Sequence, residues 1–412
     1  MKTAAINVPP QKVSVPILTA AFAVCFVSIL FSGVTSMLMS VYLPVAVKDM
    51  LGNVSGAKFE NISAYVNAIF VFGSMFGGFT WGFICDRIGR SKAVILSTVC
   101  YGLFTLLTAF SSSWVLVSAY RFFTGFGVGG VIVTTNILIA EIWPAKNRAV
   151  ALGIVGVGMP IGFIFSGVMN NAFSNWHYAF LTGIIPLALA LIAMVVLRES
   201  AQRQDNINQS DTSSKNIFAP EYKKELVTGS LIFGAMLIGL WAIFLWAPTW
   251  IQSIAGAENA QQLRGETMMI LAGGGIVGSC VSGWLVNLAG LRKTMMLCFA
   301  VCFIMTFVVF KLNTAVTTAT FIQMAVLAFF FGISQGALSV YIPLLFPAVI
   351  RASATGFCYN IGRLFTGSVV FFIGALEGLL GGYGNAVFVF SFIFIVGFAV
   401  TFFSHNQNKI TN

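Results

Sequence analysis

The chain has 412 residues, of which 58% are hydrophobic and only 8% are charged. Soluble domains carry about 25% charged residues, and a globule of this size could not bury so much apolar surface. The composition therefore excludes a soluble enzyme and a disordered chain. The net charge of +10 does not indicate a nucleic-acid partner, because the cations are not clustered as a binding face.

Twelve continuously apolar stretches follow one another along the chain. A helix that crosses about 30 Å of hydrocarbon needs about 20 apolar residues, whereas the strands of a membrane barrel are about 10 residues long and alternate in polarity. We therefore predict an all-α membrane protein with twelve transmembrane helices. Their approximate limits are 16–45, 61–84, 92–110, 114–140, 149–170, 177–197, 226–252, 266–288, 294–310, 316–343, 352–376 and 384–403.

Lysines and arginines are distributed unevenly between the loops of this topology. Sixteen lie in the two tails and the even-numbered loops, and only four, Lys48, Lys58, Arg264 and Lys311, lie in the odd-numbered loops. Loops that carry an excess of positive charge stay in the cytoplasm. We therefore expect both termini to be cytoplasmic and the chain to lie in a cell inner (plasma) membrane.

The longest polar segment, residues 198–225, holds five basic and five acidic residues and divides the spans into six and six. Its composition is typical of a cytoplasmic linker. The predicted organisation is a tail over 1–15, a six-helix bundle over 16–197, the linker over 198–225, a second six-helix bundle over 226–403 and a tail over 404–412.

The two halves resemble each other at a nearly constant offset. Segment 143–149 is matched by segment 346–352, 203 residues later, and the glycines and the polar residue of segment 82–89 are matched in segment 283–290, 201 residues later. A duplicated six-span unit is a known plan of transporters, which hold substrate near the membrane midplane where the halves meet.

Several of these segments resemble a known family. Segment 82–92, with Gly82, Asp86, Gly89 and Arg90, resembles the loop between spans two and three of the major facilitator superfamily, and segment 120–130 resembles its span-four motif. Segment 138–148 is similar to the end of span four in the sugar, organic-anion and organic-cation branches. The resemblance implies a secondary transporter made of two pseudo-symmetric six-helix bundles that works by alternating access.

Segment 345–363 looks most like the branch of aromatic-acid and sialic-acid proton symporters. Those relatives usually carry an Asp-Gly-aromatic-Asp motif in span one. This chain has Ser32, Gly33, Val34 and Thr35 at the equivalent position, so both acids are missing. Proton symport and facilitated diffusion or exchange therefore both remain open.

Arg363 is the charged residue that lies deepest in a predicted span. It follows Arg351 by 12 residues, which places it about 18 Å from the cytoplasmic end of its helix. A charge inside a bilayer costs several kcal/mol and is a functional candidate for that reason. We interpret Arg363 as the binding partner of a substrate carboxylate through bidentate hydrogen bonds. The alternative is a buried arginine that backbone carbonyls satisfy.

Arg121 lies in the outer part of span four, where a structural or gating role and direct substrate contact are both open. Polar and aromatic side chains within spans face protein or a cavity in preference to lipid. They are therefore candidates for substrate contact, with packing between helices as the alternative. These residues are Asn136, Trp246, Gln335, Tyr359 and Asn360.

Charged residues at the cytoplasmic helix ends resemble the inner latch of the superfamily, which must break when the transporter opens inward. The alternative is a solvated loop that only enforces topology. The residues are Asp86, Arg87, Arg90, Glu141, Arg148 and Arg351. Glu377, near the outer end of span eleven, is interpreted as a solvated boundary residue.

The sequence thus predicts a secondary active or facilitative transporter of a small organic anion, a carboxylate such as an aromatic, sugar or sialic acid. Two alternatives remain: a transporter of a neutral sugar or of a drug-like or cationic solute with a structural Arg363, and a receptor that binds without translocating. We expect a monomer in the lipid bilayer with no cofactor, no metal and no nucleic acid. Whether protons act as a second partner stays open.

Overall fold

The computed structural model describes residues 15–52, 56–144, 147–197, 217–256, 259–347 and 350–404. Within these ranges, twelve helices or helix pairs are long and apolar enough to cross a bilayer, and no strand occurs. The predicted all-α fold with twelve spans is therefore confirmed. Residues 1–14 of the predicted first tail, 198–216 of the linker and 405–412 of the last tail lie outside the described residues.

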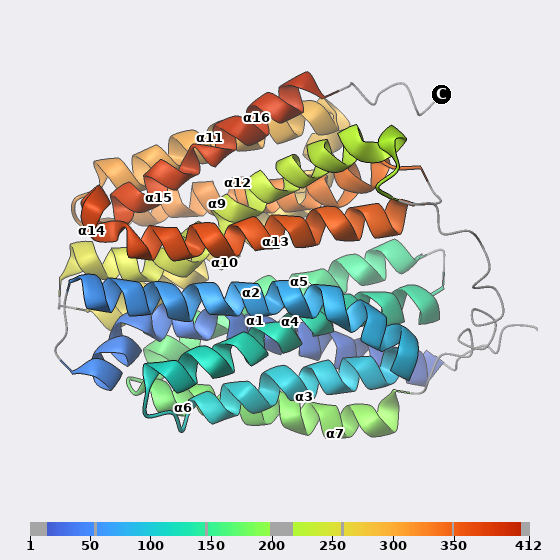
Figure 1. The fold of residues 1–412 in the computed structure, drawn as a ribbon, viewed down its shortest axis with the longest axis horizontal. Coiled ribbons are helices and arrows are strands. Elements are labelled where there is room, and N and C mark those ends of the chain that lie inside the picture. Colours follow the sequence, from blue (N-terminus) through green and yellow to red (C-terminus); the bar gives the residue numbers. More distant parts are fainter. Residues whose placement is uncertain are drawn as a thin grey trace, which may run out of the picture.

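The first six spans form one bundle, here called the N-bundle, and the last six form the C-bundle. The two bundles lie side by side with their helices along the long axis of the molecule (Figure 1). The helices of the N-bundle are α1 (Val15–Leu51), α2 (Ala57–Ile88), α3 (Arg90–Thr108), α4 (Trp114–Ile142), α5 (Arg148–Ala172) and a sixth span made of α6 (Trp176–Phe180), the short 3-10 turn η2 (Leu181–Gly183) and α7 (Ile184–Val196).

The C-bundle repeats this order after a short 3-10 turn. Its last span is again broken into two helices. The elements are η3 (Pro220–Tyr222), α9 (Lys223–Ala255), α10 (Ala260–Ala289), α11 (Leu291–Leu312), α12 (Thr318–Leu344), α13 (Arg351–Ala375), the short α14 (Glu377–Leu380) and a final span made of α15 (Tyr383–Ser391) and α16 (Ile393–Phe403).

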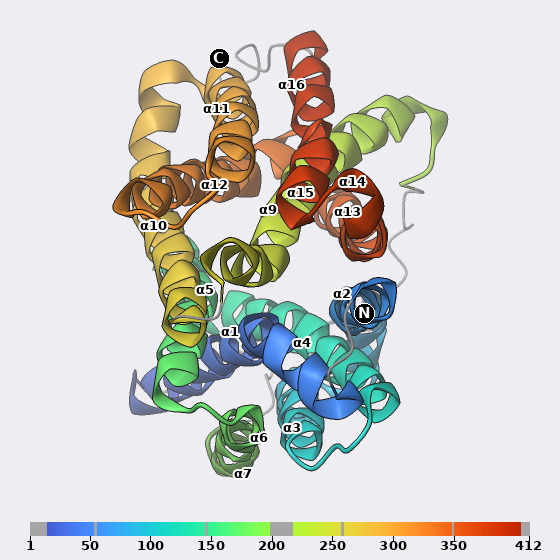
Figure 2. The same ribbon diagram turned by 90° about the vertical axis from the view of Figure 1, so that its left-hand side faces the viewer.

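The two ends of the molecule are distinguished by where the chain enters and leaves. The start of α1, the end of α7, the start of α9 and the end of α16 all lie at one end, called the linker end below; the opposite end is called the far end (Figure 1). Seen from the far end, α2 of the N-bundle lies beside α13 of the C-bundle, and α5 lies beside α10, with α1 and α9 between these pairs (Figure 2). The bundles therefore meet along three helix pairs.

The predicted duplication is visible in the backbone. Gly89 and Gly290, 201 residues apart, join α2 to α3 and α10 to α11 with φ angles of 102° and 82°. These left-handed angles favour glycine, since they strain any residue with a Cβ. Arg148 and Arg351, 203 residues apart, each begin a helix and donate from Nε to the carbonyl five residues earlier, at 3.4 and 3.2 Å.

Glycines let the backbones of paired helices touch within each bundle. A methyl group on Gly73 would collide with the Phe122 carbonyl, and one on Gly129 would collide with the Ser74 carbonyl, so α2 and α4 pack backbone to backbone. The same contact recurs between α10 and α12, where a methyl group on Gly332 would collide with the Gly275 carbonyl. Small residues at helix crossings serve this purpose in membranes.

The close approach of α2 and α4 yields a first prediction. We expect Gly129→Ala to lower the unfolding temperature in detergent, because overpacking of this kind costs about 1–3 kcal/mol. Gly153→Ala is the matched control, since a methyl group on Gly153 meets no atom within 4 Å. The measurement is the temperature at which the monodisperse peak in size-exclusion chromatography is lost. Equal shifts for both variants would contradict the packing interpretation.

Candidate substrate site

Arg363 lies at the seam between the two bundles. It projects from α13 toward α2, where a methyl group on Gly78 would come within 2.8 Å of a guanidinium nitrogen. The side chain is partly buried. Among the described residues, no hydrogen bond or ion pair reaches its guanidinium, and the neighbouring ionisable side chain is that of Tyr359. A positive charge deep in the fold is thus left without a counter-ion.

Tyr359 and Asn360 lie one helical turn from Arg363 on the same helix. The Tyr359 ring stacks on Phe233 of α9, with centroids 4.0 Å apart and planes 11° apart. Asn360 is 8% exposed; its amide donates to the Gly356 carbonyl at 3.1 Å, and its Oδ1 is buried without a hydrogen-bond partner. The structure therefore brings together three of the predicted substrate-binding residues, one of them with an unused acceptor.

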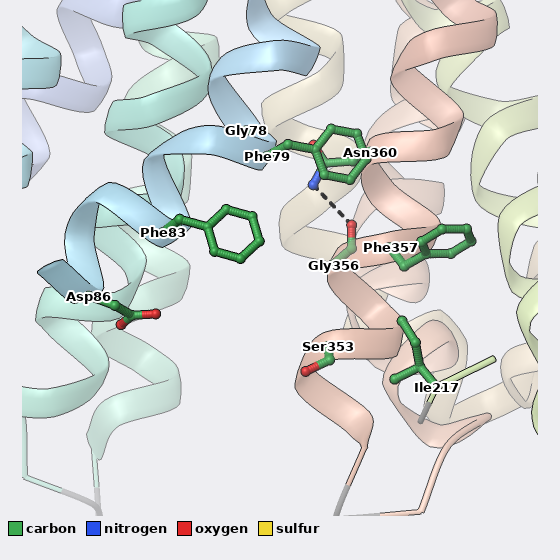
Figure 3. Close-up of a pocket in the computed structure, with 10 residues that line it drawn as sticks. Gly78, Phe79, Phe83, Asp86, Ile217, Ser353, Gly356, Phe357 and Asn360 are labelled. Carbon is green, nitrogen blue, oxygen red and sulfur yellow. Dashed lines mark hydrogen bonds between the residues drawn. The ribbon is translucent and has the colours of Figure 1, made fainter. Parts of the chain in front are cut away.

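A cavity of about 340 Å³ opens between α2 and α13 on the linker side of these residues. Figure 3 shows the two helices diverging from Gly78 and Asn360 toward Asp86 and Ser353. The volume is in the range of sites for small ligands, which are about 300–1,000 Å³. The walls are mostly aromatic and glycine, and the lining residues are Gly78, Phe79, Gly82, Phe83, Asp86, Ile217, Ser353, Gly356, Phe357 and Asn360.

Arg121 is held inside the N-bundle. It is 1% exposed, it donates to the carbonyls of Thr35 at 2.8 Å and Ser36 at 3.2 Å, and its guanidinium lies 4.0 Å from the centroid of the Phe70 ring. The carbonyls and the ring face provide acceptors and a cation–π contact in place of a carboxylate. Arg121 thus joins α4 to α1 and α2, away from the cavity beside Arg363.

The other predicted contact residues lie elsewhere. Trp246 is fully buried, donates to the Val370 carbonyl at 3.1 Å and stacks on Tyr383, so it packs α9 against α13 and α15. Gln335 on α12 is half-buried with an Nε2 that has no partner, and Asn136 on α4 is exposed. None of these three side chains lines the cavity between α2 and α13, and of the three candidates on α13 the lining includes Asn360 but neither Tyr359 nor Arg363.

Several charged residues at the linker end bond to groups of their own bundle. Arg90 bonds to Glu141 at 2.8 Å and lies 3.5 Å from Asp86, both in the N-bundle. Arg148 and Arg351 donate to carbonyls of their own bundles, as described above, and Arg87 is exposed at the end of α2. At this end the helices α2 and α13 stand apart around the cavity.

The far end is closed by hydrogen bonds between the bundles. Ser40 of α1 donates to the Leu245 carbonyl of α9 at 2.6 Å, and Asn170 of α5 exchanges two hydrogen bonds with Gln261 of α10, at 2.5 and 2.6 Å. With the cavity at the other end, this conformation is open toward the linker end and closed at the far end.

Arg264 is a residue of this closure that sequence reasoning missed. It was expected to be an ordinary loop cation, yet it is only 3% exposed within α10. Its Nε donates to the Val41 carbonyl of α1 at 2.7 Å, and NH1 donates to Gln252 of α9 at 2.5 Å. No local signal marks this role, because a cation near a helix end has the same sequence appearance whether it faces water or a partner bundle.

Comparison with known families now identifies the fold. Residues 24–367 match the family described as Major Facilitator Superfamily. The chain belongs to this superfamily. The predicted fold class, and the prediction of a transporter instead of an enzyme, are thereby confirmed.

Two relatives show which branch of the superfamily the chain resembles. It is 27% identical over 322 residues to a probable 4-methylmuconolactone transporter of Cupriavidus pinatubonensis, which covers 74% of this chain and 72% of that protein. It is 25% identical to a cis,cis-muconate transport protein of Acinetobacter baylyi, with 84% of each chain covered. The predicted resemblance to the organic-anion branch is therefore confirmed.

The fold is also similar to a solved structure. The inward open conformation of the xylose transporter XylE from E. coli matches with a TM-score of 0.80 and 15% identity, covering 96% of this chain and 98% of that one. At this level of identity the likeness concerns the fold alone. It agrees with two six-helix bundles that can rock against each other.

Because a major facilitator transporter alternates between openings at its two ends, the closure around Arg264 yields a second prediction. We expect Arg264→Gln to favour opening at the far end about tenfold or more, since a hydrogen bond to a charged group contributes about 1.5–3 kcal/mol. The measurement is the distance distribution between spin labels on the far ends of α5 and α10.

Lys311→Gln is the matched control. Lys311 is a far-end cation whose hydrogen bond to Asn385, at 2.7 Å, stays within the C-bundle. A population with separated far ends should grow for Arg264→Gln and not for the control. An unchanged distribution in both variants would remove Arg264 from the closure.

Proposed function

We propose that this chain transports a small organic anion by alternating access and that Arg363 binds the carboxylate of the substrate. The observation that carries the proposal is the uncompensated guanidinium at the seam of the bundles. An unpaired buried charge is costly, and a carboxylate that accepts two parallel hydrogen bonds relieves that cost. Neutralisation by the substrate also gives a reason for the bundles to close around it.

The residues that line the cavity favour a planar, unsaturated acid as the substrate. Phe83 of α2 points its ring into the space between α2 and α13, and Phe79 places its ring beside Asn360. The Phe357 ring lies on the other side of α13 (Figure 3), where its centroid is 5.3 Å from that of Phe218. Aromatic faces favour flat apolar bodies, and the free Oδ1 of Asn360 offers a single acceptor for a hydroxyl or a protonated group. The relatives named for muconate and a muconolactone handle acids of this kind, which agrees with the proposal.

We propose that the linker end faces the cytoplasm of a bacterial cell, in the inner membrane, and that the chain works as a monomer. The excess of lysine and arginine in the tails and even-numbered loops supports this orientation. In it, the conformation described above is open to the cytoplasm. The charged cluster of Arg90, Asp86 and Glu141 then lies at the cytoplasmic gate, where bonds across the bundles would form as the cavity closes.

The positions of the acidic residues support transport that is driven by the substrate gradient. Every described aspartate and glutamate lies in a loop or within two helical turns of a helix end, and α1 contains none deeper than Asp49. Arg121, the deep arginine of α4, is bonded through its terminal nitrogens to two carbonyls of α1. We therefore propose facilitated diffusion or exchange, with no proton carried across the membrane.

The binding role of Arg363 yields a third prediction. We expect cis,cis-muconate and benzoate to raise the melting temperature of the purified protein, and Arg363→Gln to weaken this binding about 10- to 100-fold, the loss expected for hydrogen bonds to a charged group. Arg292→Gln is the matched control, because Arg292 donates to the Thr401 carbonyl at 3.2 Å, away from the cavity. Stabilisation by neutral sugars or cations that survives Arg363→Gln would make Arg363 structural.

The absence of a deep acid yields a fourth prediction. In proteoliposomes, we expect unlabelled muconate inside to speed the uptake of labelled muconate, and a pH gradient alone to drive no uphill uptake. Liposomes without protein control for passive entry of the protonated acid. Accumulation above the external concentration, driven by an inward proton gradient, would establish proton symport and overturn this part of the proposal.

A further inference from the structure

Two carboxyl groups, one from each bundle, meet at the far end of the seam. Glu60 lies in the first turn of α2, and Glu377 begins α14, directly after α13. A methyl group on Gly378 would lie 3.1 Å from the Glu60 Oε2, so the Glu60 carboxyl rests against the backbone of α14. This contact sets the Glu60 carboxyl beside Glu377 of the other bundle, where the two carboxyls act on each other electrostatically, and both residues are half-buried.

A hydrogen bond between two carboxyl groups requires a proton, because ionised carboxylates are acceptors only. Burial, followed by the neighbouring Glu60 carboxyl, raises the pKa of Glu377 to about 7. Glu377 is a half-buried boundary residue, and the titration that its sequence position leaves open is favoured by this environment. The environment could not be predicted from the sequence, because Glu60 and Glu377 are brought together only by the packing of α2 on α13 and α14.

The surroundings of the pair contain an unused donor and no neutralising cation. Tyr383 of α15 is 6% exposed, its hydroxyl has no hydrogen-bond partner, and both carboxyls act on it electrostatically. Among the described residues, the charged group that acts on Glu377 is Glu60. Lys58 on α2 is exposed, and Lys311 on α11 is bonded to Asn385 of α15. Within the described part of the chain, a buried hydroxyl thus lies near a pair of carboxyls that no cation neutralises.

We infer that Glu60, Glu377 and the facing Tyr383 hydroxyl form a proton-binding site that spans the two bundles and is filled while the far end is closed. When the bundles separate at that end, the two carboxyls part, each is solvated by itself, and the shared proton leaves as hydronium. Closure takes one proton from the solution at the far end, and opening returns it to the same solution. No net proton crosses the membrane, so the site makes closure of the far end depend on pH. This inference adds to the proposed function and does not replace it.

The sign of the pH dependence follows from the two states. In the closed state the pair holds its proton up to a pKa of about 7, whereas a separated glutamate has an ordinary pKa of about 4.3. The extra stability of the closed state is fully present at pH values below about 4.3 and is lost as the pH rises through about 7. Between the two, a one-proton linkage changes the open-to-closed ratio by up to tenfold per pH unit.

The experiment measures far-end opening without any substrate, so it does not depend on the identity of the transported acid. Ser40 is fully buried between α1 and α9 at the far end. Ser40→Cys therefore places a thiol that a charged thiosulfonate reaches only when that end opens. The rate of modification is followed by intact mass between pH 5.5 and 8, with the unsubstituted protein, which has seven cysteines of its own, as the blank.

Every rate is divided by the rate of the Ser40→Cys protein that also carries Glu60→Gln, which cancels the ionisation of the thiol itself. We expect this ratio to rise up to about tenfold per pH unit toward pH 7 and to level off above it. Glu377→Gln should abolish the rise of the modification rate with pH, as Glu60→Gln does. The variant with both substitutions should show no further change, because the two carboxyls share one proton. The two single substitutions also guard against the loss of one variant through misfolding.

Glu266→Gln is the matched control, since the Glu266 carboxylate lies near the same end but is bonded to Gln262 of its own helix at 2.7 Å. It should keep the full pH dependence. A ratio that stays constant from pH 5.5 to 8, or a rise that Glu266→Gln also abolishes, would overturn the proton site. Failure of muconate or benzoate to bind would overturn the proposed substrate and leave this result unaffected.

Discussion

The seam between the two bundles is the constraint on which the rest of the structure depends. Within a bundle, glycines bring helix backbones into direct contact, and a methyl group at Gly73 or Gly332 would collide with a facing carbonyl. Such contacts define one arrangement and resist sliding. Between the bundles, side chains also donate to carbonyls at the far end, as with Ser40 and Arg264, beside one close backbone contact between Gly167 and Gly265. The hydrogen bonds of these side chains can be exchanged for water when the bundles separate as rigid units.

Two arginines inside the membrane differ in the acceptors that the fold supplies to their charge. Arg121 has two carbonyl acceptors and a ring face, all supplied by its own bundle. Arg363 has no such acceptors among the described residues and points across the seam to Gly78. An arginine that already has acceptors in the fold is stabilised little by a ligand. An arginine without acceptors at a moving interface is stabilised by a bound carboxylate, and this stabilisation can shift the arrangement of both bundles.

The described acidic residues lie near the two ends of the molecule, where water can reach them. Those at the cavity and those at the far end are therefore separate groups. The cavity beside Arg363 holds one acid, Asp86, at its linker-end mouth. The pair of Glu60 and Glu377 lies at the opposite end of the same α2–α13 seam. The proposed substrate site and the proposed proton site thus share a pair of helices but lie toward different ends of the molecule.

The sequence by itself determined the twelve spans and the duplication. Each of these depends on local composition or on a fixed spacing, and the backbone of a membrane helix satisfies its own hydrogen bonds whatever its neighbours are. Arg363 was also found from sequence, because a charge in the middle of an apolar run is visible without any knowledge of contacts.

Only the tertiary structure decided which polar residues share a site. Tyr359 and Asn360 lie with Arg363 because one helix carries all three, while Trp246, Gln335 and Asn136 are directed elsewhere by the rotation of their helices. Arg264 and Glu377 each resemble an ordinary residue near a helix end. Their roles depend on partners 223 and 317 residues away in the chain, Val41 and Glu60. Such contacts follow from how two bundles dock, and no local pattern encodes that geometry.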